Sequence, residues 1–425
     1  MSLLESEVDA ARGVTETLRG PLLLRCVHCS STHTGGSSFE GCPDCRADGF
    51  RSNQVIADKG SRPFSRPPVD DRSSGLWRWR DSLPRLADGA EVTLGEGNTP
   101  LLDFERQGYT LHIKDESQNP TWSHKDRLCA VAASHAVSTG AQVMVVSSSG
   151  NHALSAAAYA ARAGLPCVVI THEGMPPAVR SAVEAFGALL VIVPGPDRWP
   201  LVERSVHELG WYPFSNYTAP VAGNPVAADG YKTIAFELAE QLSWTSPTSI
   251  IVPTGYAEAL CGIWRGFKDM RAAGAVRELP KMVSVEPAVS APLHTSLLKG
   301  LDRPVPVEAG KSIAASINVK VTSLDAMRTI RESGGAALAV GEEEIAAAHG
   351  ELAFRGLYVE NASAASFAGL LQAEADRLDL GERPVVLTTS SGLKDAHTRR
   401  SANELTLDGT WDSFLRAVPE ELLSP

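Results

Sequence analysis

The sequence predicts an α/β fold of two lobes, each built on an open parallel sheet. Two series of short β-branched runs followed by helical patterns support this prediction, one over residues 143–193 and one over 249–391. Continuous apolar strands that alternate with helices of ten or more residues are typical of parallel strands covered on both faces. A chain of 425 residues with 43% hydrophobic content is long enough for two or three packed units.

The expected elements of the first series are strands at 143–148, 166–170 and 189–193, with alanine-rich helices at 152–164 and 176–188. The second series has strands at 249–255, 281–287, 336–340 and 384–391, and helices from Leu260 to Met270 and at 362–378. Ligands in open α/β sheets bind at the carboxyl ends of the strands. The loops that follow these strands are therefore the places to search for a site.

We expect three segments along the chain. Residues 1–60 form a small N-terminal knuckle, 61–220 the first α/β lobe and 221–425 the second. Residues 61–75 concentrate proline, serine and charge, a composition typical of a linker.

Charge and hydropathy exclude several classes of protein. The balance of 39 basic against 50 acidic residues gives a net charge of −11, which disfavours nucleic acid and anionic membranes as partners. The first residues have neither the basic nor the apolar region of a signal peptide. No apolar run approaches the roughly 20 residues that span a bilayer. We expect a cytoplasmic protein.

Four cysteines near the N-terminus have the spacing of a zinc knuckle. Cys26 and Cys29 form CVHC, and after twelve residues Cys42 and Cys45 form CPDC. In the cytoplasm such pairs indicate metal binding rather than disulfides. We expect structural zinc in tetrahedral thiolate coordination. The alternatives are a knuckle that has lost its metal and reduced cysteines without a function.

Three loops after expected strands are rich in small polar residues: SSSGN (147–151), PTGYAEAL (253–260) and TTSSGLKD (388–395). Taken alone, Asn151 at the start of a helix is better explained as a helix cap. The loop at Gly255 precedes a helix whose backbone N–H groups and dipole can receive a phosphate. The GxxxxGK[ST] pattern of nucleotide-hydrolysing proteins is missing, so the sequence does not indicate nucleotide hydrolysis. Lys125 follows a proline-containing turn, where a lone lysine is ordinarily a solvated charge.

Four ordered segments change the interpretation of that lysine. They are LGEGNTPL (94–101), KDESQNPTWSHKDR (114–127), SSSGNHALSAAAYAARAGLPCVVI (147–170) and VVLTTSSGLKD (385–395). Together they resemble the motifs of threonine synthases and related fold-type-II pyridoxal-phosphate enzymes, over roughly residues 90–395. The resemblance implies a bilobal fold-type-II enzyme with its active site between the lobes and pyridoxal 5′-phosphate as cofactor. The cysteine segment, predicted from its spacing, would be a zinc-ribbon-like appendage to this fold.

The resemblance also assigns roles to residues. It makes Lys125 the lysine that forms the Schiff base with the cofactor, and Asn151 the residue that contacts the cofactor's 3′ oxygen. Thr389 aligns with the hydroxyl residue that meets the pyridine nitrogen, with Thr388 or Ser390 as alternatives. The phosphate-binding loop corresponds to Gly255, Tyr256, Ala257, Glu258 and Ala259. A carboxylate repels a phosphate, so we expect backbone amides to bind it and Glu258 to face the substrate side or the helix flank.

Two departures from the family concern the substrate. Trp122 and His124 stand where the family typically shows glycine and phenylalanine. They either pack against the neighbouring lobe or line the site, in which case Trp122 narrows it and His124 adds a group that titrates near neutrality. Ser148 and Ser149 are further candidates for substrate contact. No cluster of arginine and lysine announces a second phosphate site, which favours a specialised substrate over O-phosphohomoserine.

A lysine amine can hold the aldehyde of the cofactor and then act as the base at Cα. A neutral hydroxyl at the ring nitrogen makes the ring a modest electron sink, which favours loss of a leaving group. The predicted function is therefore a lyase or synthase that performs β- or γ-elimination or replacement on a hydroxylated or O-activated amino acid. The alternatives are a threonine or serine dehydratase and, from another class, a catalytically dead zinc-ribbon binding protein. The expected partner is a small amino acid, and analogy with the family allows a homodimer.

Overall fold

The computed structural model describes residues 22–35, 39–58, 64–67, 75–394 and 410–417. The chain up to Lys394 forms one compact unit, and the short helix α14 (Trp411–Ala417) belongs to a second unit. In the part of the chain that is described, no helix is both long and apolar enough to cross a membrane.

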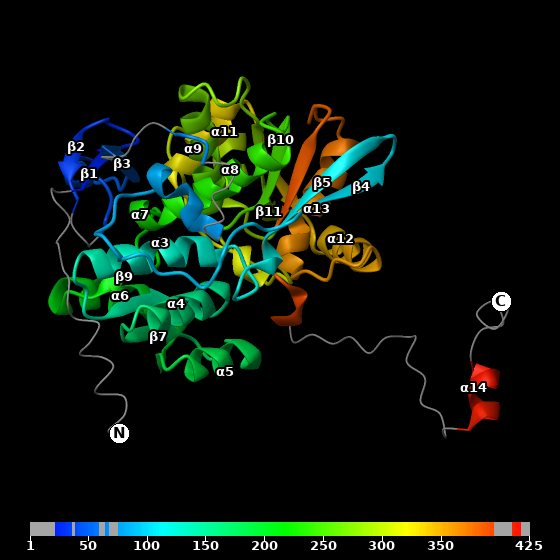
Figure 1. The fold of residues 1–425 in the computed structure, drawn as a ribbon, viewed down its shortest axis with the longest axis horizontal. Helices are drawn as coiled ribbons and strands as arrows, with labels where there is room; N and C mark the ends of the chain where they lie inside the picture. The colour runs from blue at the N-terminus through cyan, green and yellow to red at the C-terminus, as the bar shows by residue number, and fades with distance from the viewer. Residues whose placement is uncertain (1–21, 36–38, 59–63, 68–74, 395–409, 418–425) are drawn as a thin grey trace. The chain divides into compact units, whose positions relative to one another are not determined.

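The larger sheet has six strands in the order β12-β11-β10-β13-β5-β4 (Figure 1). Its strands are β4 (Leu101–Arg106), β5 (Tyr109–Asp115), β10 (Ser249–Pro253), β11 (Lys281–Pro287), β12 (Ala336–Val340) and β13 (Pro384–Thr388). Neighbouring strands run parallel except for β4, which forms an antiparallel hairpin with β5.

Alternate residues of these strands enter two different cores. Ile250 and Val252 of β10 face one hydrophobic cluster, and Ile251 between them faces the other. Helices α8 (Lys232–Gln241), α9 (Glu258–Ala272) and α11 (Leu324–Ser333) contribute to the first cluster, and α12 (Glu342–Phe354) and α13 (Asn361–Ala375) to the second. Burial on both faces explains why the strands are continuously apolar.

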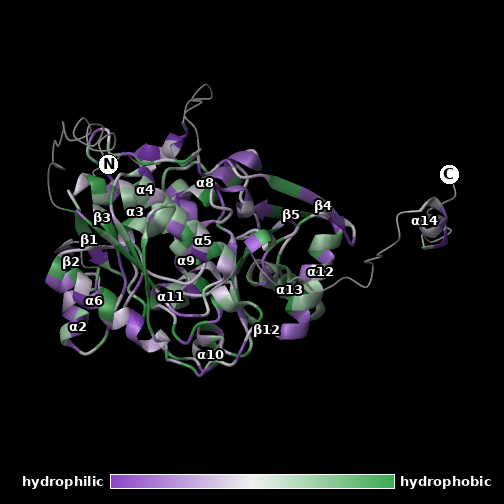
Figure 2. Ribbon diagram, turned by 90° about the horizontal axis from the view of Figure 1, so that it is seen from below, coloured by the Kyte–Doolittle hydropathy of each residue, from purple (hydrophilic) through white to green (hydrophobic). Residues whose placement is uncertain are grey.

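The smaller sheet has four parallel strands in the order β8-β7-β6-β9. They are β6 (Met144–Ser147), β7 (Cys167–Thr171), β8 (Leu189–Ile192) and β9 (Tyr212–Pro213). The associated helices are α3 (Lys125–Ser138), α4 (Asn151–Arg162), α5 (Pro177–Ala185) and α6 (Arg198–Leu209). Helix α3 is buried on nearly all sides and appears pale green in Figure 2, whereas hydrophilic residues mark the outer helices α2 and α6.

The N-terminal segment forms a small separate sheet, which we call the cysteine unit (residues 22–58 where described). Strands β1 (Leu23–Cys26), β2 (Thr32–Thr34) and β3 (Gln54–Asp58) pair antiparallel in the order β2-β1-β3, and the short helix α2 (Pro43–Ala47) lies between β2 and β3 in the sequence. Three of its cysteines share a cluster with Phe50 and with Leu324 of α11, so the unit packs against the body of the protein.

The remaining helices and turns connect these layers. They are α7 (Pro225–Ala228), α10 (Pro292–Leu298), and the 3-10 turns η2 (Gly75–Ser82), η3 (Glu116–Gln118), η4 (Gly195–Asp197), η5 (Asp229–Tyr231), η6 (Ala315–Ile317) and η7 (Gly392–Lys394).

The prediction of an α/β fold with two parallel sheets is confirmed, and each of the seven expected strands is present within a few residues of its expected bounds. The sheets do not divide at residue 220, however. Strands β4 and β5 precede that position in the sequence, yet β5 pairs with β13 in the larger sheet. The larger sheet therefore contains strands from both sides of residue 220. The lobe bounds 61–220 and 221–425 stay a prediction.

Candidate active site

The turn before α3 is tied to the end of β13. The backbone N–H of His124 donates to the carbonyl oxygen of Thr389 at 2.9 Å, and Ser123 forms an isolated bridge with Ser390. Trp122, one residue earlier, has a positive φ of 59°. These contacts bring two of the four recognised segments together and place Lys125 as the first residue of α3.

Lys125 is half-buried, and its Nζ donates to Tyr231 Oη at 3.1 Å. Burial lowers the pKa of the Lys125 amine, and the carboxylate of Glu258 opposes that shift. A lowered pKa increases the share of neutral amine near neutral pH, which is the form that attacks an aldehyde. The structure therefore gives Lys125 the environment of a reactive lysine rather than that of a solvated charge.

Two histidines lie close to this amine. Burial and the charge of Lys125 hold the pKa of both His124 and His152 well below the ordinary histidine range. The ring of His124 stacks on Tyr231 with centroids 5.4 Å apart, and its Nδ1 is 3.2 Å from the Thr389 carbonyl oxygen. Nε2 of His152 is buried and has no hydrogen-bond partner among the described residues. Both rings are thus neutral near pH 7.

Asn151 begins α4 and sits in a polar cluster. Its Nδ2 donates to both carboxylate oxygens of Glu360, at 3.1 and 2.9 Å. Its Oδ1 accepts from Ser390 Oγ at 3.2 Å and from Lys394 Nζ. The side chain does not cap α4, because Gly150 occupies the N-cap position. The capping alternative for Asn151 is therefore excluded.

The two threonines at the end of β13 face different ways. Thr388 Oγ1 lies 3.1 Å from Asp115 Oδ1 and 3.3 Å from the Lys114 carbonyl oxygen, inside the larger sheet. Thr389 Oγ1 lies 2.9 Å from Ser363 Oγ. The contact of Thr389 with the turn before Lys125 is made by its backbone carbonyl, which accepts from the His124 N–H. Which of Thr388, Thr389 and Ser390 meets the ring nitrogen stays a prediction.

The loop after β10 turns sharply into α9. Ala257 adopts a left-handed conformation with φ 69°, and no side chain caps the helix, so the first N–H groups of α9 are open to an anion. The ring of Tyr256 lies 5.8 Å from that of Trp199. Gly255 is half-buried and Ala259 is buried.

Glu258 extends along the flank of α9. It lines a small cavity with Arg265, Asn53 and Asp325, and its Oε1 lies 3.0 Å from the position that a Cβ on Gly223 would take. That oxygen is buried without a hydrogen-bond partner in the described part of the chain. Burial raises the pKa of Glu258, and the charges of Lys125 and Arg265 oppose the shift.

The candidate substrate residues differ in their surroundings. The side chain of Trp122 is 51% exposed, so it does not pack into the neighbouring lobe. His124 does contact other parts of the chain, through Thr389 and Tyr231. Ser148 and Ser149 are half-buried in the loop between β6 and α4, where the Ser148 Oγ accepts from the Gly150 N–H at 3.2 Å.

Several side chains of this region were not predicted from the sequence: Tyr231, His152, Ser363, Glu360 and Lys394. Tyr231 and Lys125 are 106 positions apart, and Asn151 and Glu360 are 209 apart. No local pattern marks such contacts. Lys394 and His152 lie inside two of the four motifs that resemble the family, so those motifs could have indicated them as site residues.

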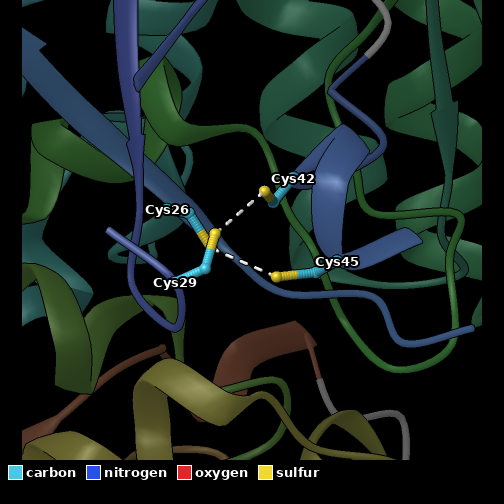
Figure 3. Close-up of side chains that lie close together, drawn as sticks. All are labelled: Cys26, Cys29, Cys42 and Cys45. Carbon is cyan, nitrogen blue, oxygen red and sulfur yellow. Dashed lines mark hydrogen bonds between the residues drawn. The ribbon is translucent and has the colours of Figure 1, made fainter. Parts of the chain in front are cut away.

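The four thiols of the cysteine unit converge on one point (Figure 3). The sulfurs of Cys26 and Cys45 are 3.7 Å apart and those of Cys29 and Cys42 are 3.6 Å apart, with all four within 4.8 Å of one another. In a tetrahedral site with Zn–S distances of about 2.3 Å, sulfurs stand about 3.8 Å apart. The thiols therefore already have the separation that a tetrahedral zinc ion requires.

Comparison with known proteins identifies the family to which this chain belongs. Residues 92–392 match the family described as pyridoxal-phosphate dependent enzyme. The chain belongs to this family. A threonine synthase of Methanocaldococcus jannaschii is 35% identical over 94% of the chain and 100% of its own length. One of Mycobacterium bovis is 35% identical over 75% of the chain and 88% of its length.

Solved structures share the fold at lower identity. Serine racemase from Dictyostelium discoideum superimposes with a TM-score of 0.57 at 24% identity, over 69% of this chain and 92% of the racemase. The O-acetylserine dependent cystathionine beta-synthase of Helicobacter pylori gives 0.57 at 22%, over 71% and 94%. The predicted family is confirmed. The chain is a threonine-synthase-like, pyridoxal-phosphate-dependent lyase or synthase of fold type II.

The residues present fit the cofactor. Lys125 offers an amine with a lowered pKa, and the start of α9 offers N–H groups to a phosphate. Within the described ranges, the buried Nε2 of His152 has no hydrogen-bond partner. The individual roles that the resemblance gives to Asn151 and Thr389 stay predictions.

Proposed function

We propose that Lys125 is the catalytic lysine of an elimination or replacement reaction on a hydroxylated or O-activated amino acid. The observation that supports it is the position of its amine, which is half-buried at the start of α3, has a lowered pKa and donates to Tyr231 Oη at 3.1 Å. Bound pyridoxal phosphate would supply an aldehyde that joins the amino group and a ring that accepts electrons from Cα. Lys125 supplies the base at Cα.

Burial lowers the pKa of the Lys125 amine, which favours its neutral form as a base. His124 and His152 carry no charge near neutral pH, so they add no attraction for an anionic leaving group. The first turn of α9 would hold the cofactor's phosphate through its N–H groups, with the Glu258 carboxyl directed along the helix flank toward Arg265. Thr389, paired with Ser363, would face the ring nitrogen without fixing its charge.

The charges close to Lys125 bear on the proposed substrate class. Lys394 donates to Asn151 Oδ1 and to the Trp122 carbonyl oxygen, the latter at 2.9 Å. A phosphorylated side chain would require cations that are not already committed in this way. We therefore propose a hydroxyl or O-acyl amino acid rather than O-phosphohomoserine as the substrate. A serine or threonine dehydratase remains the second candidate, because the same base and the same leaving group serve it.

A substrate panel tests the proposal. Purified enzyme loaded with pyridoxal phosphate is incubated with L-serine, L-threonine, their O-acetyl and O-phospho forms and O-phosphohomoserine, and the products are identified by mass. We expect turnover of a hydroxyl or O-acetyl substrate, and its loss in Lys125→Ala with the fold retained by circular dichroism. Turnover of Lys125→Ala near the wild-type rate would refute the role of Lys125. O-phosphohomoserine as the preferred substrate would refute the substrate class and favour threonine synthesis.

We also propose that Cys26, Cys29, Cys42 and Cys45 hold a structural zinc ion, on the strength of the sulfur separations of 3.6 and 3.7 Å. The ion would have no role in the chemistry at Lys125, since four thiolates complete its coordination. A homodimer is proposed from family analogy alone, and light scattering of the purified enzyme decides it.

A further inference from the structure

We propose that Tyr231 is a catalytic residue of this site, whose phenol hydroxyl delivers a proton to the oxygen that leaves the substrate. The proposal rests on the proposed role of Lys125 as the base at Cα. It adds the acid that this base requires when the leaving group is a hydroxyl.

The position of Tyr231 carries the argument. It is the last residue of η5, is fully buried, and places its Oη 3.1 Å from Lys125 Nζ. The amine also lies 5.6 Å from the centre of its ring, and His124 stacks on the ring with an interplanar angle of 26°. A proton can therefore pass directly between the amine and the phenol, within ordinary hydrogen-bond distance.

The backbone around Tyr231 is held by two glycines. A Cβ on Gly262 of α9 would lie 2.6 Å from the Cβ of Tyr231, and one on Gly230 would lie 2.2 Å from the Arg127 carbonyl oxygen. Only residues without a side chain allow α9 and α3 to approach η5 so closely. The tyrosine is thus fixed relative to both helices, and a fixed acid loses little entropy when the reaction occurs.

Other titratable groups near Lys125 are less suited to this task. His124 and His152 have pKa values held well below the ordinary range, so near pH 7 they have no ionisable proton to give. Glu258 influences Lys125 through its charge, but its Oε1 lies against Gly223 on the flank of α9. Burial raises the pKa of Tyr231 well above 10, so its hydroxyl is protonated near neutral pH.

The proton transfers balance. Lys125 as the neutral amine takes the proton from Cα, and the bond between carbon and the leaving oxygen breaks with its electron pair on oxygen. Tyr231 gives its phenol proton to that oxygen and recovers one from the Lys125 ammonium across the 3.1 Å contact. The net change moves one proton from Cα to the leaving hydroxyl, which departs as water. Both side chains return to their starting protonation states.

The experiment compares leaving groups in Tyr231→Phe, which keeps the ring and removes only the hydroxyl. Hydroxide needs a proton to leave, whereas acetate does not. We expect kcat/KM for L-serine to fall by about 100-fold or more, and that for O-acetyl-L-serine by less than about 10-fold, since general acid catalysis contributes about 10²–10⁴. Tyr212→Phe is the matched control: Tyr212 is also buried, with its Oη bonded to His135 and Asn224. That variant should show no dependence on the leaving group.

Two further measurements separate catalysis from folding and from the role of Lys125. Exchange of the Cα hydrogen of L-alanine in D₂O requires the base and no leaving group, so it should be lost in Lys125→Ala and retained in Tyr231→Phe. Cofactor titration by visible absorbance shows whether Tyr231→Phe still binds pyridoxal phosphate. If that variant fails to fold, the wild-type solvent isotope effect decides, and it should be larger for L-serine than for O-acetyl-L-serine.

If Tyr231→Phe lowers kcat/KM equally for L-serine and O-acetyl-L-serine, or loses Cα hydrogen exchange of L-alanine, the proposal is overturned and Lys125 remains the base. A dependence on the leaving group in Glu258→Gln but not in Tyr231→Phe would assign the acid to Glu258 instead. Alanine exchange that persists in Lys125→Ala, or a wild-type enzyme that turns over none of the panel, would overturn the proposed function and this inference with it.

Discussion

Replacing Arg127 by methionine tests the buried ion-pair network under the first turn of α3. The Arg127 side chain is fully buried and donates six hydrogen bonds, two to Glu116, two to Glu237 and one each to Thr99 and Thr233. Its Nε lies 2.6 Å from Glu116 Oε2, and its Nη1 2.6 Å from Glu237 Oε1. Methionine keeps much of the apolar volume and removes the charge.

The cost falls mainly on Glu116. Glu237 would keep Lys114, whose Nζ lies 2.8 Å away, whereas the remaining hydrogen-bond donors to Glu116, Thr99 and Asn119, are neutral and Lys114 acts on it only through its charge. Removal of one partner from a buried ion pair costs about 3–5 kcal/mol, because it leaves an uncompensated charge. We therefore expect Arg127→Met to lower the free energy of unfolding by this amount. Lys114→Met is the matched control and should cost about 1–3 kcal/mol, since Arg127 still neutralises Glu237.

Urea unfolding followed by circular dichroism measures both values, with the slope of free energy against denaturant checked for constancy. Glu116→Gln in the Arg127→Met background should recover part of the loss, because it removes the stranded charge. An Arg127→Met variant within about 1 kcal/mol of the wild type would refute the reasoning that a lone buried carboxylate is costly here. So would a Lys114→Met variant that loses as much stability as Arg127→Met.

Three further predictions concern other parts of the chain. Cys42→Ser should lower bound zinc and loosen the cysteine unit while pyridoxal phosphate still binds; metal analysis of wild-type protein that finds no zinc would contradict this. Burial raises the pKa of the Glu286 carboxyl from 4.5 to about 7. The folded state therefore favours the protonated carboxyl, and the stabilisation that this provides is fully present below pH 4.5. It is lost as the pH rises through 7, and the free energy of unfolding falls by about 3 kcal/mol. In Glu286→Gln, urea midpoints at pH 5 and pH 8.5 should differ less than in the wild type, and an unchanged difference would reject the assignment. Thr389→Val should weaken cofactor binding by about 1–3 kcal/mol if its hydroxyl meets the ring nitrogen, and unchanged affinity in a cofactor titration would exclude that role.

Much of the fold was predictable because its strands are buried on both faces. Runs such as SIIVP in β10 and PVVLT in β13 are apolar throughout, since neighbouring residues enter different cores. The hairpin of β4 and β5 was not predicted. Its first strand, LLDFER, lies at the sheet edge and is partly exposed, which dilutes the apolar signal. Its assignment to the larger sheet depends on the pairing of β5 with β13, whose first paired residues are His112 and Val385.

The candidate site divides in the same way. Lys125 and the four cysteines were found because a short motif or a fixed spacing marks them. Tyr231 was not, because its segment, ADGYKT, carries no pattern beyond that of a helix start. Its proximity to Lys125 arises from two glycine contacts, Gly230 against Arg127 and Gly262 against Tyr231, that only the assembled structure reveals.

Contacts between residues far apart in the sequence also connect the cysteine unit to the segment that leads to the site. Asn53 lies next to β3, and its Nδ2 donates to the Ala222 carbonyl oxygen at 3.0 Å, while its Oδ1 accepts from the Asp325 N–H at 3.3 Å. Ala222 begins the segment that continues through α7 to Tyr231 at the end of η5. Through the Asn53 side chain, the cysteine unit therefore contacts the backbone of the segment that leads to the proposed acid and the backbone of α11. The unit has little core of its own, and it gains buried apolar contacts by packing against Leu324 of α11.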